Sequence, residues 1–327
     1  MHYPYTSLVL TLLGKNGSWR SSGQLVGFYQ DTATHMDDYA GANVGFVSRR
    51  TLITAAAVGN TPTIVEVVMR PYIGACQHNR LILDRTAIRL ELLRSKDSFT
   101  LIHNDVAGAA IKINSAQWHL RRVRLSDNTH ARIDAALVQN RALYPINRIR
   151  IFSDSDSFKS QEIDFTGVLA GAMPTHVVIG FVSTAAVQGS NKQNPFNFAN
   201  FGLTRLQVTA AGINYPRTEL APIFVGDKLA GSQVGREYHR LLEMTHKINT
   251  PEGLLISMSD YVGGCALYAF DLTPDLASGH WSPSVRGSLE IHGAFNAIPA
   301  AHVSIIVLAE VPGVWELNAD RSVIKDW

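Results

Sequence analysis

The chain has 327 residues, enough for two domains of ordinary size. Hydrophobic residues make up 46% of it and charged residues only 17%, which is typical of a chain that buries much surface, including surface between subunits. With two cysteines and no apolar run near the roughly 18 residues of a membrane-spanning helix, the composition excludes a disulfide framework, a cysteine-rich metal knuckle and such a helix. A reducing compartment is the natural expectation.

The net charge of +2 hides an uneven distribution along the chain. Between Gly108 and Arg150 there are eight basic residues against two acidic ones, Asp127 and Asp134, so this segment carries +6 and the remainder −4. The basic residues are Lys112, Arg121, Arg122, Arg124, Arg132, Arg141, Arg148 and Arg150.

The first predicted element is a helix over residues 4–13. Tyr5, Leu8, Val9 and Leu12 are spaced i, i+3, i+4 and i+7, which places them on one helix face. The same apolar run does not resemble a secretion signal, because no Lys or Arg precedes it and no small-residue cleavage site follows it.

Residues 14–62 are rich in Gly, Ser, Asp and Thr and predict a long loop. Strands are expected next, from Val65 and then over residues 88–92, where Ile, Leu and Leu alternate with Arg and Glu. The apolar run at 99–102 is typical of a strand buried on both faces.

From residue 108 onward, short strands dominate the prediction. Helices are expected only at 129–139 and 236–247. The expected strands lie at 111–113, 123–125, 148–152, 163–165, 176–182, 203–208, 265–270, 289–295 and 303–311.

The order of these elements repeats. A helix, a strand, a loop, an alternating strand and a fully apolar strand occur near the N-terminus and again after residue 236. The repeat predicts two copies of one sandwich. Many short strands with rare helices favour β-sandwiches, whose eight-stranded, two-sheet version is the jelly roll.

Several segments resemble, in order and spacing, the hexon-like double jelly-roll major capsid protein of Polinton or Maverick transposable elements and adintoviruses. The resemblance covers nearly the whole chain. It is carried by YPYTSLVLTLL at 3–13, YQDTATHMDD at 29–38, the segment 81–102 with RSKDSF, YPINRI at 144–149, the segment 193–208 with NPFNF, the segment 261–276 with FDLTPD, and residues 287–327.

The resemblance implies an all-β double jelly roll, with the C-terminal portion of the first jelly roll at 1–107 and a complete second one at 108–327. It implies a structural protein and not an enzyme: a trimeric, pseudo-hexameric capsomer that tiles an icosahedral shell around double-stranded DNA, with penton proteins at the vertices. The location implied is the virion, assembled in the host nucleus or cytoplasm, with no cofactor and no membrane contact.

The sequence departs from the family at its start. Family members carry further chain before the YPY helix, which supplies the early strands of the first jelly roll, whereas here Met1 lies almost on that helix. A first sandwich without those strands is expected to expose open sheet edges, which favour aggregation or pairing with another chain.

The residues that suggest chemistry are better explained structurally. Asp271 and Asp275 flank Pro274 as turn residues do, and two carboxylates are too few to hold a cation. His292 and His302 are expected on adjacent strands, with Glu290 near them, but a cupin-like metal site needs a fuller ligand set. No metal site or cofactor is therefore predicted.

Nucleophilic catalysis is not indicated either. The chain has no Gly-x-Ser-x-Gly elbow and no complete phosphate-binding loop. Cys265, within CALYAF, is expected to be a small buried hydrophobic residue.

Four arginines form the candidate basic patch, which is expected to face DNA, to face an adjoining subunit or to stay solvated. Arg122, Arg124, Arg148 and Arg150 alternate with apolar residues and would line one face of a sheet. Such a face suits sequence-independent phosphate contact, or pairing with acidic residues of a neighbouring subunit.

Two questions stay open from sequence. The phenylalanines of NPFNF at 194–198 suit an exposed interface anchor and a core plug equally. The function has two rivals to the capsid role: a truncated or domesticated copy that acts as a β-sandwich binding module for glycan or protein, and a cupin-type hydrolase or oxygenase, which needs convergent metal ligands.

Overall fold

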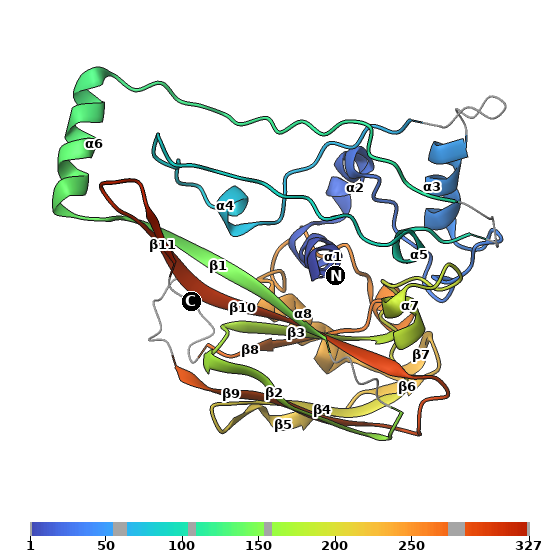
Figure 1. Cartoon of the computed structure of the whole chain (residues 1–327). Coiled ribbons are helices and arrows are strands. Elements are labelled where there is room, and N and C mark those ends of the chain that lie inside the picture. The colour runs from blue at the N-terminus through green and yellow to red at the C-terminus, as the bar shows by residue number, and fades with distance from the viewer. Residues whose placement is uncertain (1, 55–63, 104–108, 154–158, 274–284, 326–327) are drawn as a thin grey trace.

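The computed structural model describes residues 2–54, 64–103, 109–153, 159–273 and 285–325. In these residues the protein is mostly β, with antiparallel sheets and a few short helices, which confirms the expected fold class (Figure 1). All strands found in the described residues lie after residue 141. The predicted division into residues 1–107 and 108–327 stays a prediction.

Eight strands build two sheets that pack face to face. One sheet has the order β1-β10-β3-β8, with β11 (Val323–Lys325) added beside β10, and the other has the order β2-β9-β4-β5. A separate hairpin joins β6 (Ile223–Val225) and β7 (Lys228–Gln233). The eight strands are β1 (Ala142–Ser153), β2 (Glu162–Ala172), β3 (His176–Ser183), β4 (Leu203–Ala210), β5 (Ile213–Leu220), β8 (Leu267–Asp271), β9 (Arg286–Phe295) and β10 (Val303–Leu317).

The pairing of these strands identifies the topology. If β6, β7 and β11 are set aside, the first of the eight strands pairs with the last, the second with the second-last, and so on inward to β4 with β5. This is one long antiparallel hairpin, and the pairings of β10 with β3 and of β9 with β4 roll it into two sheets. That arrangement is the eight-stranded jelly roll.

A strand forms where apolar and polar residues alternate in the sequence and a neighbouring strand is present to accept and donate its main-chain hydrogen bonds. Strand β10 is buried on both faces over residues 303–309, as the mainly apolar run at 303–311 predicts. Ile305 and Val307 enter the core between the two sheets, whereas Ile306 and Leu308 enter a second core on the outer face of the first sheet. The molecule therefore has three layers.

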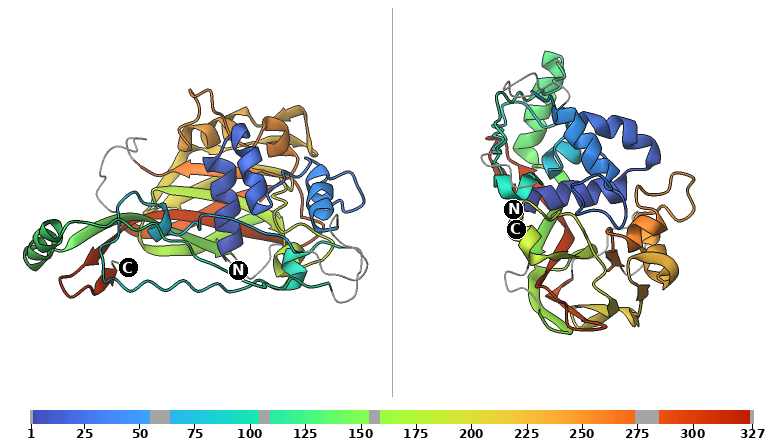
Figure 2. Two further views of the ribbon diagram at one scale, coloured as in Figure 1. Left: turned by 90° about the horizontal axis from the view of Figure 1, so that it is seen from above. Right: turned by 90° about the vertical axis from the view of Figure 1, so that its right-hand side faces the viewer.

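Helices supply the third layer (Figure 2). Helix α1 (His2–Gly14) buries Tyr5, Val9 and Leu12 against the first sheet, which confirms the predicted stripe. Helix α8 (Gly235–Met244) adds Leu241 to the same core. Each helix is stabilised mainly by this burial, since isolated helices of about this length are marginal.

The remaining helices have between 3 and 13 residues. The predicted loop at 14–62 is partly wrong, because its described residues contain the helical segments η1 (Gly17–Trp19), α2 (Arg20–Gly23), η2 (Gln24–Val26) and α3 (Val44–Thr54). Asn43 caps α3 by accepting a hydrogen bond from the Phe46 amide at 3.2 Å. The elements are η1 (Gly17–Trp19), α2 (Arg20–Gly23), η2 (Gln24–Val26), α3 (Val44–Thr54), α4 (Gly74–Gln77), α5 (Asp97–Thr100), α6 (Asp127–Gln139), α7 (Thr184–Gln188) and α9 (Met258–Val262).

The strands predicted in the first part of the chain are wrong. The described residues at 64–73, 86–96, 111–113 and 123–125 have no regular secondary structure, and part of the run at 99–102 belongs to α5. Alternation alone does not make a strand, because the main-chain N–H and C=O groups need a neighbouring strand. In the described residues no such neighbour is present for these segments.

Candidate functional site

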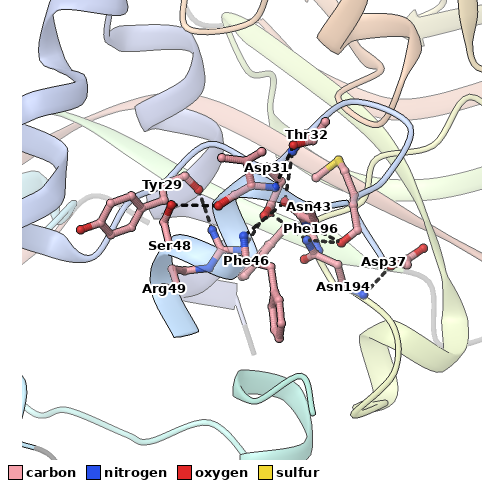
Figure 3. Close-up of polar contacts among 12 residues, drawn as sticks. Tyr29, Asp31, Thr32, Asp37, Asn43, Phe46, Ser48, Arg49, Asn194 and Phe196 are labelled. Carbon is pink, nitrogen blue, oxygen red and sulfur yellow. Dashed lines mark hydrogen bonds and ion pairs between the residues drawn. The ribbon is translucent and has the colours of Figure 1, made fainter. Parts of the chain in front are cut away.

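A polar network ties the N-terminal segment to the jelly roll (Figure 3). Arg49 of α3 pairs with Asp31 at 2.5 Å, and the other oxygen of Asp31 accepts a hydrogen bond from the Asn194 side chain at 3.0 Å. Asp37 accepts from the Asn194 amide at 2.6 Å and from the Asn197 side chain at 2.8 Å. Two carboxylates thus fix the loop that contains NPFNF.

The same loop is a core plug and not an exposed anchor. Phe198 is completely buried, and Phe196 contacts Tyr5 and Phe99 edge-on, with ring centroids 5.6 and 5.8 Å apart. The NPFNF loop therefore joins α1, α5 and the jelly roll into one aromatic cluster. Sequence left the two roles open because both use aromatic residues in a polar turn.

A second polar group crosses the whole first sheet. His176 on β3 lies 3.1 Å from Glu310 on β10 and 3.9 Å from Asp271 on β8, while Asn147 on β1 donates to Glu310 at 2.5 Å. Burial alone would lower the pKa of His176, but the hydrogen bond and charge of Glu310 outweigh it and raise the pKa. The same contact lowers the pKa of Glu310 against the effect of burial.

The sequence predicted that His292 and His302 lie next to each other, but in the structure they have different partners. His292, on the outer face of the second sheet, lies 3.2 Å from Asp164 and 3.6 Å from Glu290. The main chain of His302 instead accepts a hydrogen bond from Thr184. In the described part of the chain, no group of three or more His, Cys, Asp or Glu residues has the geometry of a metal site.

Asp271 caps a turn, as expected, by accepting a hydrogen bond from the Thr273 amide at 2.8 Å. Asp275 lies outside the described residues. Burial raises the pKa of the Cys265 thiol to about 12, so the reactive thiolate is not populated at neutral pH.

The four predicted arginines do not share a sheet face. Arg122 and Arg124 are exposed, in the irregular segment before α6, whereas Arg148 and Arg150 are partly buried on β1. Helix α6 separates the two pairs along the chain. The alternation at 121–125 suggested a strand, but in the described structure that segment has no strand beside it.

Two surface hollows of about 350 and 360 Å³ are present. The second is lined by Asp37, Asp38 and Asp227, among others. Their carboxylates already accept hydrogen bonds from Asn194, from the turn at 40–42 and from Asn200. The hollow therefore does not resemble a catalytic site, in which a carboxylate faces substrate.

Many large apolar side chains are exposed in the segment between α3 and α6, parts of which were expected to be strands. Its exposed large apolar side chains are those of Ile64, Val65, Val67, Val68, Met69, Ile73, Leu81, Ile88, Leu92, Leu93, Ile111, Ile113, Trp118, Leu120 and Val123. Large apolar side chains that are exposed along one stretch of chain suit an interaction with another molecule. Among the described residues, no helix is both long and apolar enough to span a bilayer.

Comparison with known proteins gives similarity to solved structures only. No protein-family model and no curated protein matches the chain. A cryo-EM structure of the Sputnik virophage has a TM-score of 0.38 at 11% identity, over 57% of this chain and 39% of that chain. The PBCV-1 virus capsid, a quasi-atomic model, has a TM-score of 0.36 at 10% identity, over 61% and 54%. The chain thus spans roughly two fifths to a half of the structures it matches.

Proposed function

We propose that this protein is a non-enzymatic structural subunit of the capsid of a double-stranded DNA virus. The observation that carries the proposal is the eight-stranded jelly roll, whose strands lie within 142–317. This part contains NPFNF and most of the segment 287–327, two of the segments that resemble Polinton and adintovirus capsid proteins.

The exposed apolar side chains between α3 and α6 support the same role. A chain that acts alone in water rarely leaves so many large apolar groups uncovered, whereas a shell subunit buries them between copies. We infer that copies of the chain cover this surface on assembly.

The finer proposal follows the family resemblance. Three copies form a pseudo-hexameric capsomer, capsomers tile an icosahedral shell, and penton proteins close its vertices. The basic residues Arg122, Arg124, Arg148 and Arg150 contact packaged DNA or an adjoining subunit. The protein belongs to the virion, is assembled in the host nucleus or cytoplasm, and needs no cofactor.

The test is the mass and shape of the purified full chain. We expect light scattering to give three times the 35.8 kDa of one chain, or larger closed particles visible by negative stain. A concentration series distinguishes a defined trimer from open-ended aggregate. A monodisperse monomer at every concentration contradicts the capsid role and favours the β-sandwich binding module.

A further inference from the structure

The basic arm, defined as residues 109–126, is the most exposed stretch of the described chain. Every residue from 110 to 124 is exposed. Ile111, Ile113, Trp118, Leu120 and Val123 have exposed fractions between 38 and 57%. Figure 1 shows the arm crossing one side of the molecule to reach α6.

The arm is held only at its ends. The Ile111 amide donates to Asp97 at 3.2 Å and its carbonyl accepts from Arg94 at 2.9 Å, while Ser126 caps α6. Between Lys112 and Leu125 the described structure records no hydrogen bond to a main-chain group. The arm is thus an extended peptide whose main chain is available to a strand.

The charge of the arm points to its partner. It holds four basic residues, Lys112, Arg121, Arg122 and Arg124, and no acidic one. Residues 142–327, which include the jelly roll, contain 13 Lys and Arg against 17 Asp and Glu, a net charge of −4. A second copy of this chain therefore offers surface of the opposite charge.

Two acidic residues at one edge of the jelly roll have the same spacing as two arginines of the arm. Strand β2 is an edge strand, paired only with β9. Its Glu162 and Asp164, two residues apart, lie on one face of the sheet and have side chains 65 and 70% exposed. Within the chain Glu162 pairs with Arg205 and Asp164 with His292, and both carboxylates stay accessible to a second copy. Arg122 and Arg124 have the same spacing, so an extended arm beside β2 would align opposite charges across the strands.

The arm and this edge belong to different copies in such a contact. The arm lies on one side of the molecule and the sheet that contains β2 lies on the opposite side (Figures 1 and 2). A contact between two different surfaces is head-to-tail, and it closes into a ring when the rotation per subunit allows.

We propose that the basic arm of one copy adds as a strand to the free edge of β2 in a second copy, with Arg122 and Arg124 facing Glu162 and Asp164. Strand addition supplies hydrogen bonds to an arm that has few, and the charges set the register. The inference rests on the proposed assembly function and names its interface.

The test uses charge reversal in the full chain. Arg122→Glu with Arg124→Glu should weaken self-association, measured by sedimentation, by about tenfold or more, because like charges then face each other. Glu162→Lys with Asp164→Lys should weaken it similarly. The four changes together should restore it. The matched control is Arg217→Glu with Lys228→Glu, two exposed residues that lie outside the arm and outside the segment between α3 and α6, and it should have no effect.

Circular dichroism checks that each variant is folded. The inference is overturned if the arm variant associates like the parent chain, or if the fourfold variant is folded and does not recover association. It is also overturned if the arm variant loses only binding to a duplex DNA oligonucleotide, which assigns the arm to DNA. The capsid role survives these results and fails only if the parent chain is monomeric throughout.

Discussion

At the scale of single residues, His176 makes stability depend on pH. The pKa of His176 is raised in the folded chain. Its contribution to the stability of the fold is therefore complete at a pH below its pKa in the unfolded chain, near 6.5, and is lost as the pH rises through its pKa in the folded chain. The lowered pKa of Glu310 makes its own contribution complete above about 4.5. We expect His176→Gln to reduce stability by on the order of 1–2 kcal/mol near pH 6 and by less near pH 8.

Urea unfolding at the two pH values measures this difference. The matched control is His292→Gln, which removes an imidazole between two carboxylates where the ring is 41% exposed. An exposed pair contributes little, so this control should change stability slightly at both pH values. Equal effects of the two substitutions would show that the polar contacts of His176 across the first sheet do not stabilise the fold more than an exposed pair does.

Glu237 should make stability depend on pH in the opposite sense to Glu310, because the pKa of Glu237 is raised and that of Glu310 is lowered. It is only 3% exposed on α8, and burial raises the pKa of its carboxyl group. The contribution of Glu237 to stability is therefore greatest at a pH below its pKa in the unfolded chain, near 4.5, and decreases as the pH rises toward its pKa in the folded chain. Glu237→Gln should raise the melting temperature at pH 7 and change it little at pH 4, and a lower melting temperature at pH 7 would refute this account.

At the scale of elements, α1 should unfold together with the jelly roll. Leu12 is 4% exposed in the core that α1 shares with the first sheet. Leu12→Ala should cost about 2–5 kcal/mol in a single unfolding transition. The same substitution at Leu52 of α3, 39% exposed, should cost much less. A separate early transition for α1 would contradict this shared core.

The sequence predicted strands correctly within the jelly roll, where each strand pairs with another strand of the same sheet. Strands β3, β4, β9 and β10 follow alternating or continuous apolar patterns, and each finds its neighbour within the jelly roll. The segment at 88–92 has an equally clear pattern and forms no strand, because its pattern specifies a face and not a partner.

The site residues were less predictable for a related reason. His176 and Glu310 are 134 residues apart, and only the register of β3 against β10 brings them together. Asn43 is the exception, since an Asn before α3 is a recognisable cap that the loop-like composition of 14–62 concealed. For the phenylalanines of NPFNF, no sequence pattern distinguishes an exposed anchor at a subunit interface from side chains that fill the core.

At the scale of the whole molecule, the two parts of the chain differ in how their main chain is protected. Strand β1 is hydrogen-bonded along its length to β10, whereas the basic arm has no recorded main-chain hydrogen bond from Lys112 to Leu125 in the described structure. Cleavage by a protease requires local opening, which the arm does not need. Two of the four predicted arginines lie in the arm and two lie on β1, so one protease that cleaves after arginine can compare how well the two regions are protected.

Trypsin should cut after Arg122 or Arg124 before it cuts after Arg148 or Arg150, with rates that differ by on the order of tenfold or more. Mass spectrometry of early fragments identifies the sites. If the arm pairs with β2 of a second copy, raising the protein concentration should slow cleavage in the arm and leave that in β1 unchanged. Equal early cleavage at β1 would mean that this edge of the jelly roll opens as readily as the arm, and the first sheet would then not be the stable part of the subunit.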